Sequence, residues 1–167
     1  ESASAKFVLE KRLGLKSPPL ISMGDAPDKP DPEGFINLSK KLLGDKLGTS
    51  NIPIGYVGDT IADIHTVANA KKEIPSQKFI SIGIAPPHLH SKYRLNDRNA
   101  YEKNLKEAGA DLILNSINEL ESINLELFWK IKLKRFFLNH VRRRRNFNYK
   151  NGTKQDYMNN SETKIIL

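Results

Sequence analysis

The sequence predicts an α/β protein with a doubly wound, Rossmann-like parallel sheet. Helix and strand patterns alternate along residues 1–121, beginning with a helix and ending with a strand. The predicted strands are short, continuously apolar runs, as is typical of parallel strands that are covered on both faces. Ligands of such folds bind at the carboxyl ends of the strands, so we expect functional residues directly after them.

Each element of residues 1–121 is predicted from the spacing of its apolar side chains and from its end signals. Apolar residues at helical spacing indicate four helices, over residues 2–14, 32–44, 60–72 and 99–109. Continuous apolar runs indicate four strands, over residues 18–25, 51–59, 78–84 and 110–115. Asp31 suits the cap of the second helix and Pro32 its first position. Residues 85–98 are polar and are predicted to form a loop near the edge where the strands end.

The composition narrows the class of protein. The chain has no cysteine, which excludes disulfides and thiolate metal sites and favours a reducing compartment. No apolar run reaches the roughly 18 to 20 residues that a membrane span needs, and the first residues do not resemble a signal peptide. We therefore expect a soluble, cytoplasmic protein. Because the chain starts at Glu1 with helical sequence already under way, we also expect that residues precede it.

The charge divides the chain into two parts. The formal net charge is +8, but residues 1–121 are balanced, and residues 122–167 hold eleven lysines and arginines against three acidic side chains. The sequence therefore predicts a neutral core over residues 1–121 and a separate basic tail over residues 122–167. Nothing in the charge of the core indicates a nucleic-acid surface.

The basic tail is predicted to begin as an amphipathic helix and to continue as disordered chain from about Asn146, where the sequence is polar. The helix would interleave aromatic side chains with lysines and arginines. Such a segment can bind nucleic acid or lie on an anionic membrane surface. The alternative that we favour is an appended helix without a ligand.

Two aspartates follow the apolar run 51–59. Asp59 ends the predicted strand, directly after Gly58, and Asp63 comes about one helical turn later. A strand end holds a carboxylate rigidly, and a glycine beside it lets another group approach closely. Two carboxylates suit Mg²⁺, which keeps several waters and takes one or two protein ligands beside a substrate phosphate. We therefore predict Asp59 and Asp63 as metal ligands; alternatively, both merely favour the helix start by capping and charge.

Lys29 lies at another predicted strand-to-helix junction, in the segment DKPDPEGF. Because Lys29 precedes Pro30, its backbone favours an extended conformation, and Pro32 then starts a helix. From this junction a lysine could reach a phosphate that is also bound by a metal at the next strand. Taken alone, the segment favours an ordinary surface lysine at Lys29, but the two motifs in this order are more specific than either one.

With both motifs in place, residues 1–121 resemble the haloacid dehalogenase-like hydrolases, particularly the subfamily similar to phosphoglycolate phosphatase. The resemblance rests on KPDPEGF, GYVGDTIADI and GADLILNSINEL. It implies a Mg²⁺-dependent phosphomonoester hydrolase that attacks a small phosphorylated metabolite through an aspartyl-phosphate intermediate. It also implies that Lys29 is the catalytic lysine that stabilises the phosphorylated nucleophile. Asp59 would be a Mg²⁺ ligand, and Asp63 would be a ligand or would orient the metal's water shell.

The chain departs from this family at one essential motif. The family carries its nucleophile and its acid/base in an amino-terminal Asp-x-Asp, and this spacing occurs nowhere in the 167 residues. We therefore interpret the chain as the carboxy-terminal part of the enzyme and expect it to be inactive by itself. A phosphosugar mutase with the same core is an alternative, and so is a non-catalytic protein that binds through its basic tail.

Three histidines are weaker candidates. His65 follows the aspartates on the predicted helix, and His88 and His90 lie in the polar loop. Their spacing does not match a histidine metal site, and Mg²⁺ prefers oxygen ligands. We expect His65 on a helix surface and the other two in a solvent-exposed loop.

Overall fold

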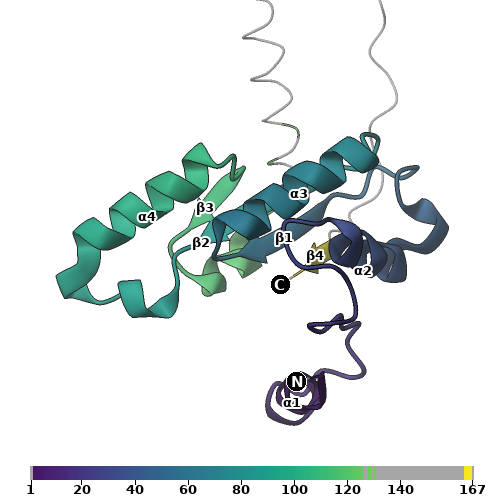
Figure 1. Cartoon of the computed structure of the whole chain (residues 1–167), viewed down its shortest axis with the longest axis horizontal. Coiled ribbons are helices and arrows are strands. Elements are labelled where there is room, and N and C mark those ends of the chain that lie inside the picture. Colours follow the sequence, from purple (N-terminus) through teal and green to yellow (C-terminus); the bar gives the residue numbers. More distant parts are fainter. Residues whose placement is uncertain (1, 126–127, 129, 131–163, 167) are drawn as a thin grey trace, which may run out of the picture.

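A computed structural model describes residues 2–125, 128, 130 and 164–166 of the chain (Figure 1). The helices are α1 (Ser2–Phe7), α2 (Glu33–Leu43), α3 (Ile61–Glu73) and α4 (Leu95–Glu107). The strands are β1 (Ile54–Gly58), β2 (Phe79–Ile84), β3 (Leu112–Leu114) and β4 (Lys164–Ile166). The described residues also form shorter helical elements: the π-helical η1 (Val8–Arg12) and the 3-10 turns η2 (Gly44–Lys46), η3 (Pro87–Leu89), η4 (Lys92–Arg94) and η5 (Ile117–Ser122).

The four strands form one parallel sheet in the order β3-β2-β1-β4. β1 pairs with β2 from Ile54 opposite Phe79 to Gly58 opposite Gly83. β3 continues the sheet beside the second half of β2, and β4 pairs with the first three residues of β1. Because all four strands run in the same direction, the residues that follow β1, β2 and β3 gather at one edge of the sheet.

The mixed α/β class and the parallel sheet are confirmed, whereas the doubly wound arrangement is not. From β1 to β3 each strand is added on the same side of the previous one, and right-handed crossovers then place the connecting helices on one face. Figure 1 shows α2, α3 and α4 in front of the strands. β4 lies on the other side of β1, which is the reversal of strand order that a doubly wound sheet requires, but the chain between β3 and β4 lies largely outside the described residues, so a second layer of helices is not shown.

Apolar side chains fill both faces of the sheet. Under α2 and α3, one cluster comprises Phe35, Ile36, Leu43, Ile52, Ile54, Tyr56, Val67, Ala70 and Phe79. On the opposite face, a second cluster comprises Val57, Ile80, Ile82, Leu114 and Leu125, with η5 side chains packed against it. Successive strand residues point to opposite faces, so burial of both faces explains why the strands are apolar throughout.

The strand predicted over residues 18–25 is wrong. Pro18 and Pro19 lack the backbone N–H groups that a sheet ladder needs, and the chain then turns on itself. The backbone N–H of Ser22 donates to the Asp25 carboxylate, while the N–H of Asp25 donates to the Ser22 carbonyl. The apolar character of this segment therefore does not make it a strand.

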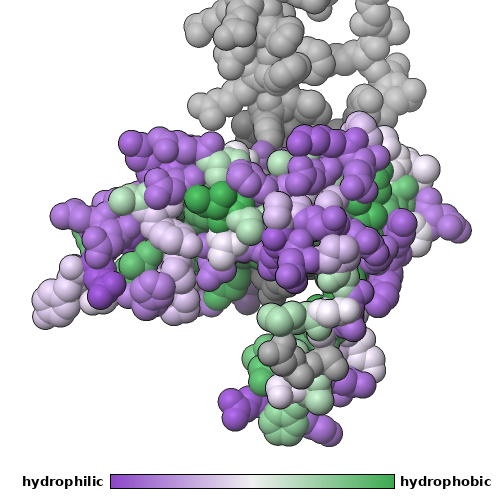
Figure 2. All heavy atoms as spheres, viewed as in Figure 1, coloured by the Kyte–Doolittle hydropathy of each residue, from purple (hydrophilic) through white to green (hydrophobic). Residues whose placement is uncertain are grey.

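The amino-terminal elements α1 and η1 lie below the α/β body in the view of Figure 1. Several of their apolar side chains, and those of the chain that follows, are exposed: Phe7, Val8, Leu13, Leu15 and Met23. In Figure 2 the lobe at the lower end of the molecule shows green hydrophobic spheres among white and purple ones. The predicted helix over residues 2–14 is thus present, although its second half is π-helical.

Most of the basic tail lies outside the described residues, and so do nearly all of its predicted amphipathic helix and its predicted disordered stretch. Leu125 is described and is buried in the second core cluster. Residues 164–166 form β4, whereas the sequence analysis predicts disordered chain from about Asn146 onward. Over the described parts of the chain, no helix combines the length and apolar character that crossing a membrane requires.

Candidate functional site

Asp59 and Asp63 lie where β1 meets α3. β1 is buried over Ile54–Val57, whereas Asp59, directly after the strand, is exposed. α3 then begins at Ile61 with Thr60 as its N-cap, and Asp63 is buried in the first turn. A rigid strand thus presents one carboxylate to solvent, and the helix start holds the second carboxylate beneath it.

A capping box fixes this junction. The Asp63 backbone N–H donates to the Thr60 hydroxyl oxygen at 3.2 Å, and the Thr60 backbone N–H donates to Asp63 Oδ2 at 2.9 Å. This reciprocal pair satisfies two N–H groups that the helix end would otherwise leave open. If the two aspartates only favour the helix start, the sequence predicts Asp59 as the N-cap of this helix. The structure instead has Thr60 as the N-cap.

Gly58 allows the helix start to pack directly on the strand end. A Cβ atom built at Gly58 would lie 2.5 Å from Asp63 Cγ and 2.7 Å from Asp63 Oδ2, closer than real contacts allow. The absence of a side chain at Gly58 therefore lets the buried Asp63 carboxylate sit against the backbone of β1. This is the close approach that the Gly-Asp motif predicts.

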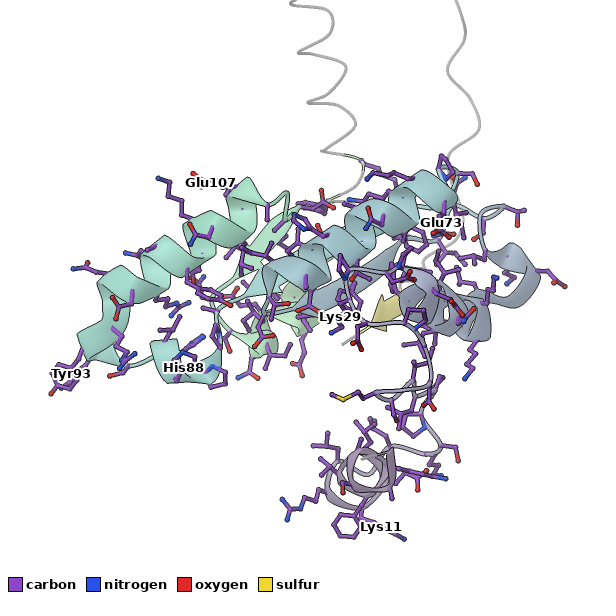
Figure 3. The ribbon with its side chains drawn as sticks, viewed as in Figure 1. Lys11, Lys29, Glu73, His88, Tyr93 and Glu107 are labelled. Carbon is purple, nitrogen blue, oxygen red and sulfur yellow. The ribbon has the colours of Figure 1, made fainter. Side chains whose placement is uncertain are left out.

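Lys29 reaches the same carboxylate from the loop that precedes α2. Its Nζ lies 2.6 Å from Asp63 Oδ1, and Figure 3 shows Lys29 below α3. The loop is held to α3 at a second point, because the Asn69 side-chain amide donates to the Pro30 carbonyl at 3.0 Å. Asp31 supports the start of α2 by accepting the Glu33 backbone N–H at 2.9 Å. Lys29 is therefore anchored between two helices.

Tyr56 completes the surroundings of Asp63. Its hydroxyl donates to Asp63 Oδ1 at 3.0 Å, and the Lys29 ammonium lies 5.6 Å from the centre of its ring. The ring packs edge-on against Phe35, with the ring centres 5.0 Å apart. A core contact between β1 and α2 thus positions a polar group of the site.

Both oxygens of Asp63 are engaged by donors. Oδ1 faces Lys29 and the Tyr56 hydroxyl, and Oδ2 accepts the backbone N–H and the hydroxyl of Thr60, the latter at 2.7 Å. Because both of its oxygens accept from charged or polar donors, the Asp63 carboxylate holds these donor groups in place. For Asp63 to bind a cation directly, one of these donors, most simply the half-exposed Lys29, has to move aside.

The charges of Lys29 and Asp63 stabilise each other. Burial alone raises the pKa of the Asp63 carboxyl, but the hydrogen bonds from Lys29 and Thr60 outweigh it, and the pKa is lowered. Partial burial lowers the pKa of Lys29, yet its contacts with Asp63 and Tyr56 raise the pKa above its ordinary value. Burial raises the pKa of the Tyr56 hydroxyl. Lys29 is thus a cation and Asp63 an anion at neutral pH.

Asp59 differs from Asp63 in having an open carboxylate. Its side chain has no hydrogen-bond or ion-pair partner within residues 2–125, but its backbone carbonyl accepts the Tyr101 hydroxyl of α4 at 2.7 Å. Burial raises the pKa of Tyr101, and the negative charges of Asp59 and Asp63 add to the increase. Among the described residues, no group of three or more histidines, aspartates or glutamates could surround a metal. Any cation at Asp59 would therefore keep most of its waters.

The structure brings Lys29 and Asp63 into contact and places Asp59 at the end of the adjacent strand. Sequence reasoning missed Tyr56, Thr60, Asn69 and Tyr101; only Thr60 carried a signal, as a threonine three residues before an acidic side chain. His65 is exposed on α3, and His88 and His90 lie on the exposed loop as expected. The His90 ring contacts the Ala85 carbonyl at 2.7 Å.

The chain was compared with protein-family models, with curated proteins and with solved structures, and none of them matches it.

Proposed function

We propose that this chain supplies the lysine and the magnesium ligands of a haloacid dehalogenase-like phosphomonoester hydrolase. The proposal depends chiefly on one observation: Lys29 lies 2.6 Å from Asp63, and Asp59, one helical turn before Asp63, directly follows the buried strand β1. A cation from the loop before α2 thus contacts one carboxylate of the β1–α3 junction, and the second carboxylate, Asp59, lies at the start of the same junction. The resemblance of KPDPEGF and GYVGDTIADI to the motifs of that family points to the same chemistry.

The donor set suits Mg²⁺ better than a transition metal, because it consists of carboxylate oxygens with room for water. Asp59, with its free carboxylate, would be the ligand, and Asp63 would hold Lys29 or exchange it for the metal. When bound, Mg²⁺ would neutralise charge on phosphoryl oxygens. Lys29 would place its ammonium beside the same oxygens, where a preorganised cation stabilises developing negative charge.

A complete reaction needs a nucleophile, and the family uses an aspartate of an Asp-x-Asp motif, which these 167 residues do not contain. That aspartate would attack the phosphorus, expel the alcohol and leave an aspartyl-phosphate for water to hydrolyse. We therefore expect the nucleophile to come from a segment outside this sequence. A small phosphorylated metabolite as substrate and a cytoplasmic location belong to the same proposal, and a phosphosugar mutase stays the alternative.

The test is hydrolysis of a generic phosphomonoester with and without Mg²⁺. The 167 residues alone should show no Mg²⁺-dependent turnover, whereas a longer chain that adds an in-frame Asp-x-Asp strand should hydrolyse the ester. In that longer chain, Lys29→Ala and Asp59→Asn should each lower the rate on the order of a hundredfold or more, as expected for loss of one preorganised electrostatic group.

Two exposed residues of similar charge serve as controls. Lys92→Ala in η4 and Asp97→Asn in the first turn of α4 should leave the rate of the longer chain unchanged because neither contacts the site. Robust turnover by the 167 residues would overturn the aspartyl-phosphate mechanism. An active longer chain whose rate is indifferent to Lys29→Ala and Asp59→Asn would overturn the site.

A further inference from the structure

Tyr101 of α4 contacts Asp59, the residue that directly follows β1. Its hydroxyl on α4 donates to the backbone carbonyl of Asp59 at 2.7 Å. This bond leaves the Asp59 carboxylate free, because the bond uses the main chain of that residue and not its side chain. The sequence offers no motif for this contact, which depends on how α4 crosses the edge of the sheet.

α4 also contacts the residue that directly follows β3. Arg98, one helical turn before Tyr101, donates from Nη2 to the carbonyl of Asn115 at 3.1 Å and from Nε to Glu102 at 2.7 Å. Asn115 directly follows β3, just as Asp59 directly follows β1. α4 therefore fastens the chain at the carboxyl ends of two strands, with β2 between them.

We propose that Tyr101 is a positioning residue that holds the Asp59 peptide, and with it the Asp59 carboxylate, in the orientation that binds Mg²⁺. The inference rests on the proposed function. The Asp59 carbonyl and the Thr60 N–H belong to one planar peptide unit. Asp63 Oδ2 accepts from the N–H side of this unit, and the Tyr101 hydroxyl donates to its carbonyl side. The Tyr101 contact thus gives the unit a second point of attachment, on the residue that carries the free carboxylate.

The experiment compares Tyr101→Phe with the wild-type 167 residues and with Tyr93→Phe. Tyr93 offers a matched control because it is also a tyrosine near the start of α4, but its side chain is largely exposed and its ring lies against Lys92. Nuclear magnetic resonance reports the carbonyl carbon shift of Asp59 and the hydrogen exchange of the Thr60 amide. Melting temperature checks that the fold is intact.

Tyr101→Phe should move the Asp59 carbonyl shift, speed exchange at Thr60 and leave the melting temperature nearly unchanged, whereas Tyr93→Phe should change none of these. In a titration with Mg²⁺ alone, Tyr101→Phe should weaken binding roughly tenfold, as loss of a group that orients a metal ligand does.

Unchanged carbonyl shift, exchange and Mg²⁺ affinity in Tyr101→Phe would overturn the role of Tyr101 and leave the proposed magnesium site standing. If the wild-type chain binds no Mg²⁺, the magnesium site of the proposed function fails, and the proposed positioning for Mg²⁺ fails with it. The two failures are therefore distinguished by the wild-type titration.

Discussion

The Lys29 ammonium lies 2.6 Å from Oδ1 of Asp63, a side chain that is almost fully buried. Lys29 itself is about half exposed, with 54% of its side-chain surface accessible. The pair thus joins a loop at the surface to the first turn of α3. It serves the fold by holding that loop, and it serves the proposed chemistry by placing a cation at the end of β1.

The Lys29–Asp63 pair should contribute measurably to stability. A double-mutant cycle with Lys29→Ala and Asp63→Asn, followed by urea unfolding, should give a coupling free energy of about 1 kcal/mol, allowing for solvent screening at Lys29. The exposed pair Lys103–Glu107, whose charged atoms lie 3.7 Å apart, provides the control and should give a coupling near zero. Equal coupling in the two cycles would show that Asp63 does not anchor Lys29.

The lowered pKa of Asp63 predicts a loss of stability in acid. A carboxyl whose pKa is lower in the folded state stabilises the fold above its unfolded pKa of about 3.9, and this contribution disappears as pH falls through the folded pKa. The difference in the free energy of unfolding between the wild type and Asp63→Asn should therefore shrink as pH falls through the folded pKa. A constant difference between the two proteins from neutral pH into acid would contradict the shift.

The raised pKa of Lys29 makes the opposite prediction at high pH. Its stabilising contribution is complete below the unfolded pKa of about 10.4 and is lost as pH rises through the folded pKa. Lys29→Ala should therefore reduce the alkaline loss of stability relative to the wild type. Urea unfolding over the alkaline range measures this difference, and parallel curves for both proteins would rule out the ion pair as its source.

Gly58→Ala should destabilise the protein because the added methyl group would collide with Asp63. Overpacking of this kind costs about 1 to 3 kcal/mol, which chemical denaturation resolves. Gly34→Ala is the matched control: its Cβ would lie 3.2 Å from the Ala26 side chain, a tight contact that the higher helix propensity of alanine partly offsets. A Gly58→Ala protein as stable as Gly34→Ala would mean that the junction can rearrange without cost.

Sequence patterns predicted the candidate residues because the two motifs are local. The Gly58-Asp59 pair follows a continuously apolar strand, and the Lys29 segment precedes a helix that Asp31 and Pro32 predict. The strand expected before Lys29 is absent, so Lys29 reaches Asp63 from a loop rather than from a strand end. Local sequence still sufficed to predict β1, β2, β3 and the helices between them, with helix ends a few residues away from those observed.

The remaining features depend on contacts between distant segments. Tyr56 looked like a core residue because it alternates with Ile54 on one strand face, and nothing in its neighbours reveals a hydroxyl that meets Asp63. Tyr101 lies in a polar helix in which Leu105 is the buried residue, so its spacing does not predict which strand end the helix reaches. The winding of the sheet could not be deduced either, because strand order is a property of tertiary packing.

The basic tail supports a prediction from its sequence alone. Residues 122–167 carry a net charge of +8 that is interleaved with aromatic side chains, so binding to DNA or to anionic vesicles should weaken steeply with added salt. Truncation after residue 121 would remove Leu125 from the core, so a better variant retains all residues and replaces Arg142, Arg143, Arg144 and Arg145 with glutamine. Unchanged, salt-independent binding by this variant would show that the tail charge is not the contact.

The magnesium site at the end of β1 is tested most directly by titrating the isotope-labelled 167 residues with Mg²⁺ and following the backbone amide resonances. Saturable shifts should centre on the junction from Gly58 to Asp63, with weak affinity because a single open carboxylate leaves most ligand positions to water. Asp59→Asn should abolish these shifts, while Asp45→Asn, in an exposed turn, should preserve them. Shifts that are absent, that lie elsewhere, or that persist in Asp59→Asn would contradict the site.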